Sequence, residues 1–404
     1  MFTYVNFVLF TFVNMKYTGT ALHNLMEHYP VFRAKEISGR YLTPSHIEPL
    51  IEKTKEAFLV KEIGRSTMGN PIHTILAGKG PVKIFAWSQM HGNETTSTKA
   101  IFDLLNAFQL YPDDSLIRLI TEKITLVIIP MLNPDGAIQY TRENAHGTDL
   151  NRDAMRRKET ESNLLRQTFM DQDPDFCFNL HDQRTIFSAG VAPYPASLSF
   201  LTPAMDEARK IYPERKTSMQ LIASISADLK PWLPNQIGRY SDEYNPNCTG
   251  DTFQSLGKPT ILFEAGHFKG DYQRELTREY LTAAIFSALG NIASGNWKDY
   301  DYSEYLEIPE NEKLFYDVIL RQALINGEVR DVAIQFKEKL EKQEISFVPW
   351  IEKIGESLSY FGHKEIDCNK NPLTMANKES LRENVIVNNM YLNNEVLAIN
   401  YQNI

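Results

Sequence analysis

A histidine and a glutamate three residues apart follow a strongly apolar run in the stretch "VKIFAWSQMHGNE". His91 and Glu94 are separated by a glycine and an asparagine. Catalytic zinc sites commonly take three protein ligands from histidine and acidic side chains and leave a fourth position for water. Gly92 permits backbone angles that other residues avoid, so both side chains can turn toward one ion. The pair therefore predicts two of the three ligands of a zinc site.

Two further polar residues stand at the ends of apolar runs and complete this hypothesis. His181 follows the run in "DFCFNLHDQR" and is the best candidate of the nine histidines for the third ligand. Glu264 ends the run in "PTILFEAG" and is the candidate general base beside the metal. Each has an ordinary alternative, because histidines after strands are often surface residues and a buried glutamate is often an ion-pair partner. Their joint placement at strand ends favours the metal site.

Alternating strand and helix patterns must position these residues. The chain predicts a hairpin over 60–80 and buried strands over 82–88, 124–132, 175–180 and 259–266. It predicts helices over about 42–59, 96–110, 153–170, 203–211 and 271–290. This order indicates an α/β fold with a mostly parallel mixed sheet and helices on both faces. Ligand sites in such sheets lie at the carboxyl ends of the strands, where the four candidates fall.

The pattern changes near residue 302. The segment 311–327 is compatible with one helix, and shorter alternating pieces with Gly and Pro follow it. We divide the chain into an N-terminal extension (1–40), a catalytic domain (41–302) and a small β-rich or mixed appendage of unknown role (303–404). The simplest role for the appendage is to pack on the catalytic domain or to narrow its cleft.

Composition excludes several classes of protein. The 404 residues are 43% hydrophobic and 23% charged, with a net charge of -9, and no basic face suggests a nucleic-acid partner. Three scattered cysteines argue against a disulfide framework and a thiolate metal site. The apolar start is too short to span a bilayer and lacks the features of a signal peptide, so we expect a cytoplasmic protein without a membrane partner, and Met15 is an alternative start.

The stretch "NPDGAIQYTRENAHGTDLNRD" (133–153), taken with "HGNE", "NLHDQ" and "FEAG", resembles the zinc carboxypeptidase family, the carboxypeptidase A-like metallopeptidases. The motifs occur in the family's order, and the resemblance covers roughly residues 61–290. It implies a metallocarboxypeptidase that holds one Zn²⁺ and hydrolyses the C-terminal bond of a peptide. His91, Glu94 and His181 match the zinc ligands, and Glu264 matches the general base.

The same resemblance assigns roles to four residues between the strands. Asp149 matches the carboxylate that orients the first histidine. Arg142 matches the arginine that steadies the scissile carbonyl oxygen as negative charge develops on it. Asn151 and Arg152 match the pair that binds the substrate's terminal carboxylate, for which a guanidinium fork is well suited.

Two further positions in "GRYSDEYNPNCTGDTF" are less sharply defined. The family has a mobile tyrosine that closes over the bound carboxylate, and both Tyr240 and Tyr244 stand at a plausible distance before Glu264. We favour Tyr244. On that register Asp251 lies near the floor of the pocket for the terminal side chain and would favour Lys or Arg, although a turn-stabilising role is an ordinary alternative.

Two other functions compete with the peptidase. "HGNE" and "DLNR" also occur in the aspartoacylase and succinylglutamate desuccinylase branch, whose substrates are N-acyl amino acids. A binding module that keeps the fold without activity is the third possibility, and the complete set of ligands, base and carboxylate-binding residues argues against it. An open groove on the acyl side of the scissile bond would indicate the peptidase, whereas a closed one would indicate the deacylase.

Overall fold

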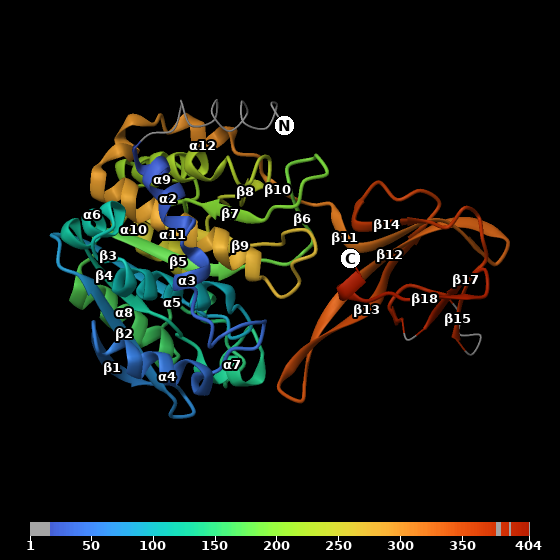
Figure 1. Ribbon diagram of the computed structural model, residues 1–404, viewed down its shortest axis with the longest axis horizontal. Coiled ribbons are helices and arrows are strands. Elements are labelled where there is room, and N and C mark those ends of the chain that lie inside the picture. Colours follow the sequence, from blue (N-terminus) through green and yellow to red (C-terminus); the bar gives the residue numbers. More distant parts are fainter. Residues whose placement is uncertain (1–16, 377–380, 388, 404) are drawn as a thin grey trace.

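The computed structural model describes residues 17–376, 381–387 and 389–403. Figure 1 shows a large α/β part, coloured blue to orange, beside a smaller part of strands at the C-terminal end. The prediction concerning Met15 lies outside the described residues. The described part of the chain contains no helix both long and apolar enough to cross a membrane.

An eight-stranded mixed sheet forms the centre of the α/β part, in the order β1-β2-β4-β3-β5-β9-β7-β8. The four central strands, β4, β3, β5 and β9, are parallel, and the outer pairings are antiparallel except for β7 with β8. The predicted mostly parallel mixed sheet is therefore confirmed. The strands are β1 (Leu59–Arg65), β2 (Pro71–Gly78), β3 (Val82–Ser88), β4 (Ile124–Ile129), β5 (Phe176–Asp182), β7 (Leu198–Leu201), β8 (Ile237–Arg239) and β9 (Thr260–Ala265).

Both faces of this sheet are covered, which explains why the central strands read as continuous apolar runs. Alternate residues of β3 enter different cores: Ile84 and Ala86 pack in the larger core, and Phe85 and Trp87 pack in a second core on the opposite face. Helices α2, α5, α6, α9 and α11 contribute to the larger core, and α8 and α10 contribute to the second. The predicted helices on both faces are therefore present (Figure 1).

The helices agree with the sequence in most places. The α5 helix has the predicted bounds, and the last long helix, α11, follows the fourth central strand as expected. The helices are α2 (Tyr17–Met26), α3 (Tyr29–Phe32), α4 (Pro44–Thr54), α5 (Thr96–Leu110), α6 (Ser115–Lys123), α7 (Pro134–Gln139), α8 (Thr160–Gln172), α9 (Pro213–Leu229), α10 (Thr249–Ser255), α11 (Glu275–Ser294) and α12 (Ser303–Glu307).

The helix predicted over 203–211 is wrong, and a longer helix, α9, begins just beyond it. The Asp206 carboxylate accepts hydrogen bonds from the Lys210 amide and the Tyr212 hydroxyl, which stabilises a turn. Arg209 adopts a left-handed φ of 51°. The α9 helix then begins at Pro213, a residue suited to the first helical position. Likewise α8 begins at Thr160 rather than near 153, because the Asp153 carboxylate accepts two backbone amides of the preceding loop.

The helix compatible with 311–327 is also wrong, because this segment forms strands β10 (Asn311–Lys313) and β11 (Phe315–Ile325). The β11 strand is buried on both faces along most of its length, so its apolar residues do not alternate clearly with polar ones. It joins a five-stranded sheet in the order β14-β11-β12-β13-β16, and a three-stranded sheet lies beside it. The remaining strands are β6 (Phe187–Ala189), β12 (Glu328–Glu341), β13 (Glu344–Gly355), β14 (Phe361–Asp367), β15 (Leu373–Met375), β16 (Val385–Ile386), β17 (Met390–Leu392) and β18 (Glu395–Leu397).

Candidate active site

The loop after β3 carries the first two predicted metal ligands. The Gln89 side chain donates hydrogen bonds to the carbonyl oxygens of Leu42 and Gly92, which fixes the path of this loop. Gly92 is required by close packing rather than by unusual backbone angles, because an added Cβ would lie 2.0 Å from the carbonyl carbon of Gly136. The loop is therefore held tightly against the "NPDG" turn, with His91 directed toward the ends of the central strands.

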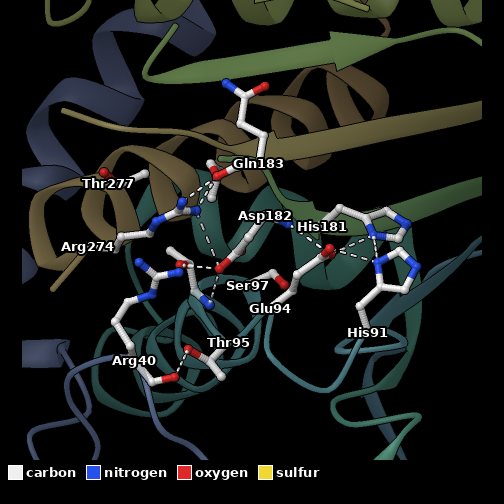
Figure 2. A network of polar contacts seen from close by, with 12 residues as sticks. Arg40, His91, Glu94, Thr95, Ser97, His181, Asp182, Gln183, Arg274 and Thr277 are labelled. Atoms are coloured by element: carbon white, nitrogen blue, oxygen red, sulfur yellow. Dashed lines mark hydrogen bonds and ion pairs between the residues drawn. The ribbon is translucent and has the colours of Figure 1, made fainter. Parts of the chain in front are cut away.

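His91, Glu94 and His181 converge at the carboxyl ends of β3 and β5 (Figure 2). The Nδ1 atoms of the two histidines lie 3.2 Å apart. They lie 2.7 and 2.8 Å, respectively, from the two carboxylate oxygens of Glu94. Both imidazoles are almost completely buried. The structure thus brings together the three residues that the sequence proposed as ligands.

The spacing and chemistry of this group fit zinc. Bonds of about 2.0–2.2 Å from nitrogen and oxygen to a tetrahedral zinc place neighbouring ligand atoms roughly 3.3 Å apart. The facing Nδ1 atoms of His91 and His181 are close to this separation. Two imidazole nitrogens with a carboxylate are also the donor set of hydrolytic zinc sites. The group could therefore hold one divalent ion with only small shifts of its side chains.

Asp149 lies where a residue that orients His91 should lie. Its Oδ1 is 3.1 Å from His91 Nε2, so a proton on Nε2 leaves the lone pair of Nδ1 directed at Glu94 and His181. His91 and Arg142 also lower the pKa of Asp149, more than offsetting the effect of burial. Asp149 is consequently ionised at neutral pH and fixes the ring of His91.

Arg142 reaches the same group from the loop after α7. Its Nε donates to Asp149 Oδ2 at 3.0 Å, and its Nη1 lies 3.4 Å from Glu94 Oε1. Its side chain is 40% exposed, so part of the guanidinium faces the cavity. This position suits a cation that stabilises negative charge developing on a substrate oxygen.

Glu264 stands on β9 opposite His181 of β5. Its Oε2 is buried and has no hydrogen-bond partner. Burial raises the pKa of Glu264 well above its usual range, and the negative charges of Glu94 and Asp182 raise it further. A carboxyl group without a partner, beside the ligand group and with an elevated pKa, has the properties of a general base or acid.

A cavity of about 1030 Å³ is lined by His91, Glu94, His181, Arg142 and Glu264, and Asp149 lies behind His91. Asn151 and Arg152 also line the cavity, on a short turn that follows Asp149. The Asn151 side chain accepts a hydrogen bond from the Thr249 amide at 3.0 Å, which ties this turn to the start of α10. Arg152 is exposed and its guanidinium also donates to the Asn151 carbonyl oxygen. Both side chains can therefore meet a ligand in the cavity.

Tyr240, Tyr244 and Asp251 line the cavity as well. The phenol of Tyr240 lies close enough to Glu264 and Glu94 for their charges to raise its pKa beyond the effect of burial. Because both tyrosines line the cavity, the choice of Tyr244 over Tyr240 stays a prediction. Asp251 is buried, and its carboxylate accepts the Asn245 amide at 3.1 Å. Burial raises the pKa of Asp251 to about 6, and this amide opposes that rise.

Three charged residues beside the ligand group were not found from the sequence. Asp182 follows His181, and its carboxylate accepts hydrogen bonds from the Thr96 amide and hydroxyl at 3.1 and 2.7 Å. Arg274 Nη1 lies 3.6 Å from Asp182 (Figure 2). Arg40 lies on the same side of Glu94 as Arg274 and lines the cavity. Of these three residues only Asp182 could have been found from the sequence, because it directly follows His181. Arg40 and Arg274 reach the site from distant segments that contain no recognisable motif.

Residues 45–226 match the sequence model of a family described as zinc carboxypeptidase. The chain is 30% identical over 151 residues to carboxypeptidase SOL1 of Arabidopsis thaliana, which covers 35% of this chain and 30% of that protein. It is 35% identical over 80 residues to gamma-D-glutamyl-L-diamino acid endopeptidase 1 of Lysinibacillus sphaericus, covering 18% of this chain and 20% of that protein. The chain thus spans less than a third of the length of either curated relative.

The fold is similar to solved structures as well. Bovine thrombin-activatable fibrinolysis inhibitor superposes with a TM-score of 0.52 at 16% identity, over 64% of this chain and 98% of that chain. At this identity the likeness concerns the fold alone.

Proposed function

We propose that the chain is a member of the zinc carboxypeptidase family, whose sequence model matches residues 45–226, and that it is a zinc-dependent carboxypeptidase that releases the last residue of a peptide with a free C-terminus. The observation that carries this proposal is the unpartnered Glu264 carboxyl beside the His91–Glu94–His181 group, in one cavity with Arg152. When bound, zinc would polarise the scissile carbonyl and lower the pKa of a coordinated water toward neutrality.

The residues of the chain perform the remaining tasks. Glu264 takes a proton from the attacking water and delivers it to the leaving amine, for which its raised pKa is suited. Arg142 faces the developing negative charge on the carbonyl oxygen. Arg152 and Asn151 bind the terminal carboxylate, and this two-point contact positions the last peptide bond beside Glu264.

Asp251 supports a preference for a cationic terminal side chain. It lines the cavity near Arg152, whose charge lowers its pKa. Above its pKa of about 6 the carboxylate would attract the side chain of Lys, Arg or another diamino acid. The name of the bacterial relative, gamma-D-glutamyl-L-diamino acid endopeptidase 1, refers to a diamino acid, which agrees with this choice.

The experiment is an assay of the zinc-loaded protein on matched peptides that end in a free carboxylate or an amide, with products identified by mass spectrometry. We expect release of a single residue from the free acids, resistance of the amides, and loss of activity with a chelator that added zinc reverses. Equal cleavage of acids and amides would contradict a carboxypeptidase. Binding without cleavage of any substrate would support the non-catalytic module.

An N-acyl amino acid deacylase is the second candidate, and one observation favours it. Residues of the C-terminal strands line the cavity, so the site is more enclosed than an open groove. A set of N-acyl amino acids therefore belongs in the same assay. Hydrolysis of these compounds with no release from peptides would select the deacylase.

A further inference from the structure

The C-terminal part of the chain contributes a wall to the cavity. Phe336, Lys337 and Glu338 are consecutive residues of β12, and all three line the same cavity as His91 and Glu264. The cavity volume of about 1030 Å³ is at the upper end of the roughly 300–1,000 Å³ typical of small-ligand sites. These three residues therefore border the space that is open to a ligand beside the metal-ligand group.

A charged contact fixes this wall to the α/β part. Arg40 Nη2 lies 2.9 Å from Glu338 Oε1, and only 4% of the Arg40 side chain is exposed. The Tyr140 hydroxyl also donates to Glu338. Arg40 precedes the first strand, and Tyr140 follows the "NPDG" turn, so Glu338 joins two segments that flank the site.

Further contacts hold the same sheet over the loops that follow β5 and β9. The Gln335 side-chain amide donates to Thr185 Oγ1 at 2.7 Å, and His363 Nε2 lies 2.8 Å from the Thr185 carbonyl oxygen. The Tyr272 hydroxyl donates to the Asp317 carboxylate at 2.8 Å. The ring of Tyr272 packs in the C-terminal core, 5.4 Å from that of Phe336. The wall is therefore part of a packed interface.

This wall stands apart from the residues assigned to the terminal carboxylate. The Asn151 amide donates to Asp149 Oδ1, which lies 3.1 Å from His91 Nε2, so the carboxylate-binding turn lies beside His91. β12 is instead paired with Arg40 through Glu338. In Figure 2, Arg40 and Arg274 lie on one side of Glu94, and His91 and His181 lie on the other. A peptide whose C-terminus meets Asn151 and Arg152 would extend its acyl part toward β12.

We propose that β12 is the end wall of the acyl side of the cleft, so that the enzyme acts on short peptides and excludes long chains. This inference rests on the proposed function. The residues that bind the C-terminus fix one end of the substrate, and Phe336, Lys337 and Glu338 limit the length that fits at the other end.

The test is a length series with one constant C-terminal dipeptide, extended stepwise at the N-terminus from dipeptide to decapeptide and assayed with the zinc-loaded full chain. We expect kcat/KM to fall by at least about tenfold between the shortest peptides and the decapeptide. Equal kcat/KM for all lengths would contradict the proposal that β12 is an end wall, but it would still agree with carboxypeptidase activity. Failure to cleave any peptide would instead contradict the proposed function.

Variants at Lys337 test whether β12 is responsible. Lys337 is exposed on β12, and its ammonium lies over the Trp350 ring, so substitution should preserve the fold. Lys337→Ala should raise the ratio of decapeptide to dipeptide kcat/KM at least about threefold, and Lys337→Trp should lower it. Lys339→Ala, two residues along the same strand, should leave the ratio unchanged. If both Lys337 variants keep the wild-type ratio, β12 is not the wall.

Discussion

A buried carboxyl group at the metal-ligand group lacks a partner, whereas the carboxyl groups that join the C-terminal strands to the α/β part have partners. At the ligand group, Glu264 Oε2 and His181 Nε2 are buried without a hydrogen-bond partner. At the interface, Arg40 pairs with Glu338, and Asp317 accepts hydrogen bonds from Tyr272 and the Phe336 amide. An unpartnered buried group costs about 1–3 kcal/mol, so it persists where a ligand or reaction compensates for it. The contrast therefore concerns the carboxyl groups: those of Glu338 and Asp317 are paired at the interface, whereas that of Glu264 is left without a partner at the ligand group.

His267 is a buried group at the interface that has no hydrogen-bond partner. Both of its ring nitrogens are buried and unpartnered, although it lies at the interface. Its ring packs against those of His363 and Tyr272, tilted by 55° and 56°, with centroids 4.3 and 4.7 Å away. Burial lowers the pKa of His267 well below its usual range, and the neighbouring His363 lowers it further. The ring is therefore neutral and serves as a packing element, so a missing partner alone does not identify a catalytic residue.

Substitution of Glu264 should give the largest effect. Glu264→Gln keeps the shape of the side chain but removes the base, so kcat should fall by about 10²–10⁴-fold while zinc content and thermal stability change little. Glu243→Gln, which alters an exposed acid of the same cavity, is the matched control. Steady-state kinetics would measure kcat of both variants, and elemental analysis would measure their zinc content. Near wild-type turnover in Glu264→Gln would show that Glu264 is not the general base.

Substitution of Arg152 should give the next largest effect, because a hydrogen bond to a charged group contributes about 1.5–3 kcal/mol. For peptides with a free carboxylate, kcat/KM of Arg152→Ala should fall by roughly 10–100-fold. Any residual cleavage of the matched amides should be unaffected. Arg184→Ala removes another exposed cation that lines the cavity and should not alter the ratio of acid to amide. Equal losses on acids and amides would show that Arg152 does not bind the carboxylate.

At the interface, Glu338→Ala should act on stability. The change leaves Arg40 buried without its carboxylate, which costs about 3–5 kcal/mol for a fully buried pair. Because 26% of the Glu338 side chain is exposed, we expect a loss of about 2 kcal/mol in the free energy of unfolding, measured by urea denaturation. Glu341→Ala removes an exposed partner of Lys339 and should change stability by less than about 0.5 kcal/mol. Similar losses in the two variants would contradict a structural role for the Arg40–Glu338 pair.

The sequence predicted the α/β part and the ligand group far better than the interface. His91, Glu94 and His181 follow buried strands, and parallel strand order brings such positions to one edge of a sheet. No comparable rule joins Arg40 to Glu338, which lie on segments 298 residues apart. The β11 strand was compatible with a helix because burial on both faces hides the alternation of a strand. The side chains that close the cavity were therefore visible only in the folded chain.

The smallest expected effect concerns Asp251, which lines the same cavity. Burial raises its pKa to about 6, so the carboxylate is charged above this pH and neutral below it. The preference for a peptide ending in Lys over one ending in Met should therefore weaken as the pH falls from 7 to 5, by up to about tenfold. Enzyme groups that act on both peptides affect both kcat/KM values equally at each pH. The ratio of the two values therefore reports the selectivity alone. In Asp251→Asn this ratio should be low and independent of pH, and a wild-type pH profile in that variant would place the selectivity elsewhere.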